Sequence, residues 1–201
     1  MNSVVQNSGW RAQLKLAFEQ RDSRTVISQR QHFGPLVVQK PFYPEGPVCH
    51  VYIIHPPGGI VGGDLLAIKT TVNSSAHALI TTPAANKFYR SAAAEAQLTQ
   101  DLTVANNAYL EWLPQETILF NGSMASTNTT VTLHKDSRFI GWEITCLGRP
   151  ASGESFRDGY YRQHFNLNFR HTDDKQQPLF IERALLRGDD ALLTATWGLK
   201  Q

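Results

Sequence analysis

The sequence has little cysteine and no long apolar run. Its 201 residues include two cysteines, Cys49 and Cys146, which are too few and too far apart for the disulfide framework of a small secreted domain. Both are therefore expected to be reduced thiols. No apolar run reaches the length of about 18 residues that a transmembrane helix needs. Residues 1–8 are polar where a signal peptide would be apolar, so we predict a cytoplasmic protein without membrane contact.

Charge of either sign is not concentrated anywhere in the chain. The 19 lysines and arginines are balanced by 17 aspartates and glutamates, and no block of like charge occurs. Nucleic-acid binding usually leaves a basic patch in the sequence, so no nucleic-acid partner is expected. A hydrophobic content of 41% in a chain of this length supports one self-sufficient core, and residues 1–201 are predicted to form a single domain.

Familiar catalytic and nucleotide-binding motifs are also missing. The sequence has neither the Gly-x-Ser-x-Gly of serine hydrolases nor the His-Glu-x-x-His of metalloproteases. Residues 55–64 are rich in glycine and proline, but Asp64 follows the last glycine where a phosphate-binding P-loop needs Lys and then Ser or Thr. The stretch is better explained as a shaped corner between two strands, since glycine permits positive φ and close backbone approach.

Alternation of apolar and polar residues is the dominant pattern. Ala12, Leu14, Leu16 and Phe18 form one such series, and similar short runs recur between clusters of Gly, Pro, Asn and Ser. Further strands are predicted at residues 36–39, 51–55, 66–72, 79–82, 96–98, 129–133, 139–141, 165–169 and 179–185. This spacing is typical of an all-β sandwich, barrel or solenoid. The best helical candidate is residues 84–96, where Pro83 could occupy the first turn, but this stretch is short and a turn is the alternative.

Three carboxylates occupy positions that need a structural explanation. Asp64 closes the glycine-rich stretch, while Glu143 and Glu182 lie within apolar strand patterns, where an unpaired buried charge would be costly. Each has an ordinary explanation as a turn cap, a solvent-facing residue or half of an ion pair. Together they would suit a divalent cation. Cys49, His50 and His55 are poorer candidates, because neighbouring and odd-spaced strand residues point to opposite faces.

Five blocks of the sequence, in order, resemble the urease accessory protein D family, called the H protein in some bacteria. The blocks are residues 34–46, 49–64, 81–91, 110–120 and 142–150, and the similarity extends over about residues 9–190. The resemblance implies a helix-poor, extended all-β fold, either a β-solenoid or a distorted sandwich, with one or two short helices.

The same resemblance implies a non-enzymatic scaffold for assembly of the urease nickel centre. Its partners would be apo-urease, the accessory F protein and the accessory GTPase G, and nickel would be a transient cargo rather than a cofactor. Asp64, Glu143 and Glu182 match acidic positions of the family pattern and are the predicted residues of an internal metal passage. Family members run beyond the point equivalent to Gln201, so the chain is expected to lack the last part of the family domain.

Two other functions fit the residues without the resemblance. The first is a β-fold hydrolase that uses two of the three carboxylates as acid and base at an open metal site. The second is a binding module that uses the surface around Tyr89 and Arg90. The hydrolase needs two carboxylates within reach of one water molecule.

Overall fold

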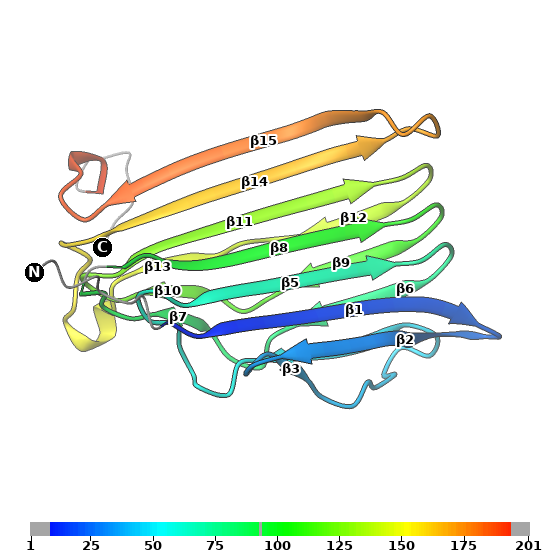
Figure 1. Cartoon of the computed structure of the whole chain (residues 1–201), viewed down its shortest axis with the longest axis horizontal. Coiled ribbons are helices and arrows are strands. Elements are labelled where there is room, and N and C mark those ends of the chain that lie inside the picture. Colours follow the sequence, from blue (N-terminus) through cyan, green and yellow to red (C-terminus); the bar gives the residue numbers. More distant parts are fainter. Residues whose placement is uncertain (1–8, 93, 194–201) are drawn as a thin grey trace, which may run out of the picture.

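The computed structural model describes residues 9–92 and 94–193, which form facing β-sheets with almost no helix (Figure 1). A seven-stranded sheet has the order β15-β14-β11-β8-β5-β1-β2, a five-stranded sheet the order β12-β9-β6-β4-β3, and a three-stranded sheet the order β13-β10-β7. The strands of the first sheet are β1 (Arg11–Arg21), β2 (Arg24–Phe33), β5 (Leu65–Val72), β8 (Ala96–Val104), β11 (Met124–Leu133), β14 (Tyr160–Arg170) and β15 (Gln176–Arg187). The others are β3 (Val37–Val38), β4 (Cys49–Ile54), β6 (His77–Thr81), β7 (Asn86–Phe88), β9 (Tyr109–Leu113), β10 (Thr117–Leu119), β12 (Arg138–Gly141) and β13 (Thr145–Leu147).

The chain winds through these sheets as a β-solenoid. Each coil contains a long strand of the first sheet, a strand of the second and a short strand of the third, and then returns to the first sheet one place along. The coils β5-β6-β7, β8-β9-β10 and β11-β12-β13 stack with parallel pairing. The hairpins β1-β2 and β14-β15 lie at the two edges of the first sheet. The predicted helix-poor solenoid is therefore confirmed.

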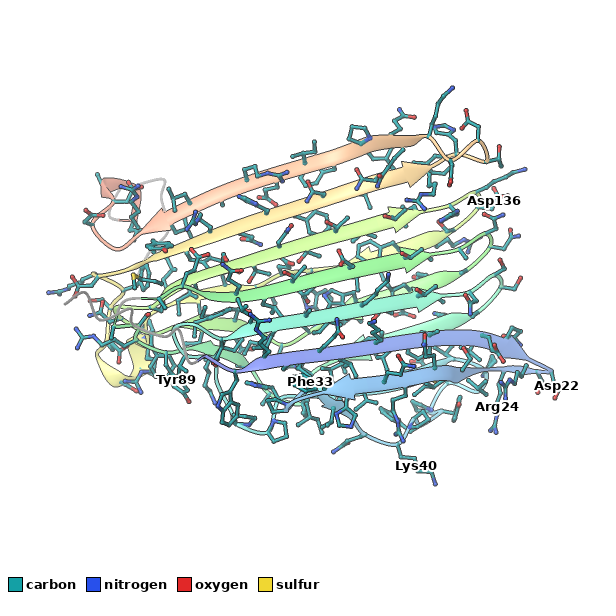
Figure 2. The ribbon with its side chains drawn as sticks, in the orientation of Figure 1. Asp22, Arg24, Phe33, Lys40, Tyr89 and Asp136 are labelled. Atoms are coloured by element: carbon teal, nitrogen blue, oxygen red, sulfur yellow. The ribbon has the colours of Figure 1, made fainter. Side chains whose placement is uncertain are left out.

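Tight turns at one end of the molecule join the first sheet to the second (Figure 1). Ser75, Asn107 and Asp136 occupy equivalent turns and all have positive φ, a conformation that polar residues such as Asn and Asp tolerate better than most. Backbone hydrogen bonds link neighbouring turns, from the Ser75 amide to the Asn106 carbonyl and from the Asn107 amide to the Lys135 carbonyl. Asp136 is seen at this end in Figure 2, as is Asp22 in the β1-β2 turn. The turns thus set a similar register in successive coils.

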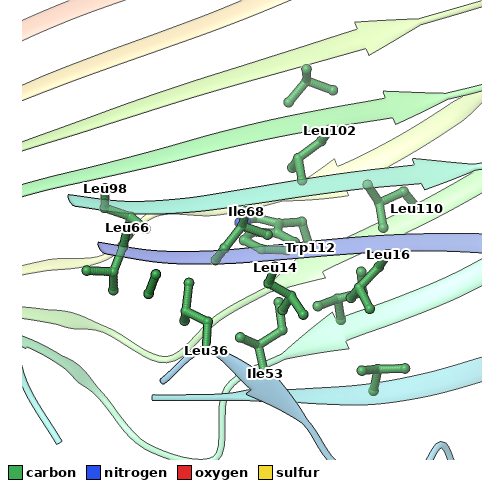
Figure 3. Packing of buried hydrophobic residues seen from close by; sticks show 14 of the residues in the cluster. Leu14, Leu16, Leu36, Ile53, Leu66, Ile68, Leu98, Leu102, Leu110 and Trp112 are labelled. Carbon is green, nitrogen blue, oxygen red and sulfur yellow. The ribbon is translucent and has the colours of Figure 1, made fainter. Parts of the chain in front are cut away.

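The core fills the space between the two large sheets (Figure 3). Alternate residues of β1, including Leu14, Leu16 and Phe18, are fully or almost fully buried, as the period-two pattern predicts. Leu110 and Trp112 of β9 meet them from the second sheet. No helix of the described residues has the length and apolar character needed to span a membrane. Cys49 and Cys146 are free thiols, and burial raises the pKa of both.

The prediction of a helix at residues 84–96 is wrong. Asn86–Phe88 form strand β7, and two short 3-10 helices lie elsewhere, at Pro150–Ser152 and Ala191–Leu193. Long-range hydrogen bonds hold β7 extended: the Ile60 amide donates to the Lys87 carbonyl and the Tyr89 amide to the Ile60 carbonyl. Phe88 is fully buried between coils, so its packing and these bonds outweigh the local helix propensity of the alanines.

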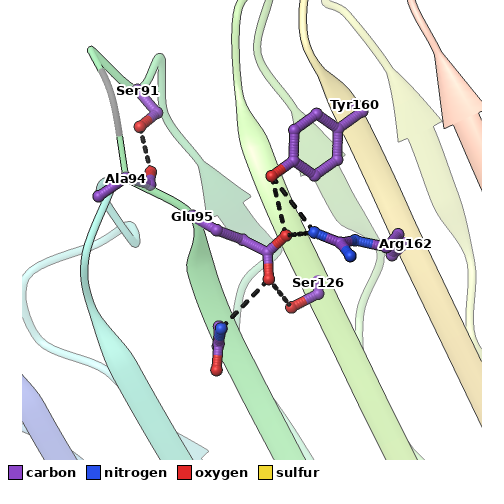
Figure 4. Close-up of polar contacts among 7 residues, drawn as sticks. Ser91, Ala94, Glu95, Ser126, Tyr160 and Arg162 are labelled. Carbon is purple, nitrogen blue, oxygen red and sulfur yellow. Dashed lines mark hydrogen bonds and ion pairs between the residues drawn. The ribbon is translucent and has the colours of Figure 1, made fainter.

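A polar cluster on the outer face ties three coils together (Figure 4). Glu95, just before β8, accepts hydrogen bonds from the Ser126 hydroxyl at 2.8 Å and the Tyr160 hydroxyl at 2.9 Å, and it forms an ion pair with Arg162. Burial alone would raise the pKa of Glu95, but these three partners outweigh burial and hold the pKa below its ordinary value. The cluster therefore stabilises the fold more when Glu95 is ionised than when it is protonated.

We expect Glu95→Gln to lower stability at neutral pH by about 1 kcal/mol and to flatten its acid dependence. A carboxyl with a depressed folded-state pKa contributes stability above its unfolded pKa of about 4.3 and loses it as the pH falls through the lower folded value. Melting temperatures recorded from pH 7 down to pH 3 measure both effects. Ser126→Ala removes one donor and keeps the charge. Its melting temperature should change with pH less steeply than that of the parent protein and more steeply than that of Glu95→Gln. Equal slopes for Glu95→Gln and the parent protein would contradict the assignment.

Candidate functional site

A line of polar side chains crosses the inner face of the first sheet, in the middle of an otherwise apolar core. Gln100 of β8 and Thr129 of β11 are buried, at 6% and 0% exposure, and the Gln100 amide donates to the Thr129 hydroxyl at 3.0 Å. Register explains their meeting, because these two residues are direct partners in the parallel β8-β11 ladder. Buried polar groups require such partners, so the hydrogen-bonded pair is a specific feature of the core.

Glu143 is the only charged member of this line. It lies in the loop between β12 and β13, so its side chain reaches from the second sheet toward the first. Its two carboxylate oxygens accept hydrogen bonds from the Thr129 hydroxyl and from the side-chain amide of Gln163 on β14. Glu143 therefore bridges the two sheets and places a half-buried negative charge between them. It also contributes, after burial, to the raised pKa of Tyr161.

Gln100 also lines a cavity of about 110 Å³ between the sheets. Other polar groups around it belong to His55, Thr82, Asn86, Lys87 and Trp112. Among the residues the structure describes, the indole N–H of Trp112 has no hydrogen-bond partner although it is buried. A space of this volume can hold several water molecules, and a water molecule there would satisfy the indole donor. Burial lowers the pKa of His55, and the nearby Asp64 charge partly opposes this shift.

Asp64 has a clear structural role at the start of β5. Only 4% exposed, it accepts hydrogen bonds from the backbone amides of Trp10 at 2.8 Å and Val61 at 3.0 Å. It thereby joins the segment before β1 to the glycine-rich corner. The corner itself is as predicted: it carries the chain from β4 to β5, and Gly63 has φ +93°. An added Cβ at Gly59 would lie 2.0 Å from the Tyr89 ring, so close packing also requires glycine there.

Glu182 is exposed on the edge strand β15. It is the direct antiparallel partner of Phe165, which in turn pairs with Thr129, so Glu182 lies on the same face of the sheet as the Glu143 contacts. Glu182 and the residues that contact Glu143 thus share one face of the first sheet, whereas Asp64 lies at the corner between β4 and β5. Within residues 9–92 and 94–193, no group of three or more His, Cys, Asp or Glu side chains is placed to hold a metal ion.

The alternative sites also have structural explanations. Tyr89 packs edge-on against Phe120, with ring centroids 4.7 Å apart, and covers Gly59. His50 is buried beside Phe42, and its Nε2 atom lies 3.6 Å from a Glu45 carboxylate oxygen. Asp64 and Glu143 are engaged by different partners, backbone amides for Asp64 and the side chains of Thr129 and Gln163 for Glu143.

Comparison with known proteins identifies the family of this chain. The family model described as UreD urease accessory protein matches residues 11–201. The chain belongs to the UreD family. A protein named urease accessory protein UreD from Aliivibrio fischeri is 51% identical over 161 residues, which are 80% of this chain and 56% of that protein.

Other UreD proteins give the same result. That of Citrobacter koseri is 48% identical over 180 residues, covering 90% of this chain and 61% of its own length, and one from Escherichia coli is 48% identical over 183 residues, covering 90% and 65%. The chain therefore spans less than two thirds of the length of these UreD relatives.

The uncharged residues of the polar line, Gln100, Thr129 and Gln163, were not predicted from the sequence. A signal was present, because Gln100 stands between Leu98 and Leu102 at positions that the period-two pattern assigns to the core. Thr129 stands at an equivalent position before Val131. A polar residue at an inward position of a strand, repeated on a neighbouring strand, indicates a buried hydrogen-bonded pair. The weakness of the signal is that Thr is also common on outward faces of strands.

Proposed function

We propose that this chain acts as a non-enzymatic scaffold in the assembly of the urease nickel centre. The observation that carries the proposal is the membership of residues 11–201 in the UreD family, whose members in Aliivibrio fischeri and Citrobacter koseri are named urease accessory proteins. Its partners in this role are apo-urease, the accessory F protein and the accessory GTPase G. A cytoplasmic location accords with the two free thiols.

Nickel passes through the protein as a transient cargo in this proposal. The polar line between the sheets supports such a route, since it supplies one carboxylate, from Glu143, together with the neutral oxygen atoms of Thr129 and the Gln side chains. A site with few charged ligands binds a divalent cation weakly and releases it, whereas a closed four-ligand site would retain it. Glu182 extends the route toward the exposed edge of the same face, and Asp64, at the corner between β4 and β5, is the third residue of the proposed route.

Complementation tests this function. The chain is expressed in a cell that makes urease and the other accessory proteins but no UreD, and urease is then purified. We expect the chain to copurify with apo-urease and the F protein and to raise the nickel content of urease above that of cells without it. Full-length UreD from Aliivibrio fischeri is the positive control. A chain that binds neither partner under conditions in which the control binds both would overturn the proposal.

A further inference from the structure

The cavity between the sheets contains a buried donor that the protein itself does not satisfy. Trp112 of β9 is 3% exposed, and its indole N–H has no hydrogen-bond partner among the described residues. An indole can donate but not accept, and a buried donor without an acceptor costs about 1–3 kcal/mol. Trp112 and Ile68, both seen in the core in Figure 3, form part of the cavity wall, and all of the wall comes from residues 36–114. An acceptor that enters this cavity therefore recovers that cost.

The rim of the cavity is held in shape by bonds between its own segments. The Ile60 amide donates to the Lys87 carbonyl at 2.7 Å, and the Gln115 amide donates to the Thr82 hydroxyl at 3.0 Å. Pro83 also belongs to the rim, and its ring fixes the backbone φ. A site that is formed in advance loses little conformational entropy when a ligand binds.

The walls favour a small uncharged molecule over a metal ion. No Asp or Glu of the described residues lines the cavity, and its one charged residue is the basic Lys87. Burial lowers the pKa of His55, so its imidazole is uncharged at neutral pH. Most of the wall is apolar and includes Leu66 and Leu98. One imidazole without a second ligand is a poor cation site, and a neighbouring ammonium group repels cations.

The volume of the cavity limits the ligand to the size of a small ring. An apolar cavity of about 150 Å³ binds benzene, and this cavity is smaller, at about 110 Å³. Water molecules beside Leu66 and Leu98 find few polar partners, so an apolar group that displaces them gains affinity. The ligand therefore needs a compact apolar body and one acceptor for the Trp112 indole.

We propose that this cavity is a binding site for a small uncharged molecule that carries a carbonyl oxygen on a compact apolar body. The carbonyl oxygen accepts the hydrogen bond of the Trp112 indole, and the apolar body packs against Leu66, Ile68 and Leu98. Gln100 lies in the same wall and donates to Thr129, so the bound molecule reaches one end of the polar line.

Nuclear magnetic resonance of the indole N–H groups tests the proposal on the isolated protein. The chain has four tryptophans, so the Trp112 signal is assigned by its loss in Trp112→Phe. Two probes of the same shape are compared, cyclopentanone and methylenecyclopentane, of which only the ketone carries an acceptor. We expect cyclopentanone to move the Trp112 signal downfield in a saturable way. It should bind about fivefold more tightly than methylenecyclopentane, the factor that one net hydrogen bond provides.

Two substitutions separate the hydrogen bond from a general effect of the probes. Trp112→Phe removes the donor and enlarges the cavity for both probes alike, so both should bind it equally well, as measured by saturation transfer to the probe. Trp10→Phe, at a tryptophan that is 57% exposed and outside the cavity, is the matched control and should keep the fivefold preference. If Trp112→Phe does not fold, single substitutions at the other three tryptophans assign the Trp112 signal by elimination, and the two probes are compared on the parent protein.

Three results would overturn the proposal. If neither probe moves the Trp112 signal up to its solubility limit, the cavity holds water only. Equal affinity of the two probes for the parent protein would show that the indole does not select an acceptor. A preference for cyclopentanone that survives Trp112→Phe would place the selection elsewhere. None of these measurements needs nickel or urease, so they are independent of the scaffold function.

Discussion

Asp64→Ala should lower the stability of the protein by about 3 kcal/mol. The substitution removes the buried acceptor of the Trp10 and Val61 amides, and a hydrogen bond to a charged group contributes about 1.5–3 kcal/mol. For a chain of this size the melting temperature should fall by about 6–12 °C. Thermal unfolding followed by circular dichroism measures the change. The loss arises from the link between the segment before β1 and the corner before β5, so amide exchange should quicken first in β1.

A second aspartate provides the matched control for this substitution. Asp101 of β8 is exposed, and Asp101→Ala should change stability by no more than about 0.5 kcal/mol. If Asp64→Ala unfolds within the same margin, the carboxylate does not hold the corner. The result also affects functional tests, since any loss of nickel delivery by Asp64→Ala has to be compared at equal amounts of folded protein.

Strands with one buried and one exposed face are the easiest to recognise in the sequence. Strand β1 was predicted because Leu14, Leu16 and Phe18 are buried while their neighbours contact solvent or the outer face. Strand β2 was not predicted, because its residues after Ile27 are exposed on both faces and do not alternate between apolar and polar. The stacking of coils was only one of several possibilities, since period-two patterns do not distinguish solenoids from sandwiches or barrels.

Strand β7 escaped prediction for a different reason. Asn86–Phe88 form β7 because of pairing with β10 and with Ile60, both distant in sequence. Local propensity favoured a helix there, and only tertiary contacts decide against it. The carboxylates show the same limit: their chemistry could be predicted, but not that Asp64 caps backbone amides while Glu143 reaches across to another sheet. Partners of a side chain depend on the register between strands, which the sequence does not state directly.

Glu143→Gln should have a large effect on function and a small one on stability. Glu143→Gln keeps the shape of the side chain and one acceptor for the Thr129 hydroxyl, and the Gln163 amide can rotate to offer its oxygen to the new N–H group. We therefore expect stability to change by no more than about 1 kcal/mol. The substitution removes the negative charge from the polar line. If nickel travels along it, delivery to urease should fall about tenfold, equivalent to 1.4 kcal/mol of cation binding.

Nickel content and activity of urease from the complementation strain measure that loss, and thermal shifts in Ni²⁺ provide a second readout that does not need urease. At a given Ni²⁺ concentration tighter binding raises the melting temperature more, so Ni²⁺ should stabilise the parent protein more than Glu143→Gln. Glu182→Gln is the control, because it removes the same charge from the same face at an exposed position where solvent screens it. A smaller effect at Glu182 places the controlling charge between the sheets. Equal effects, or none at Glu143, would mean that nickel does not depend on the buried line.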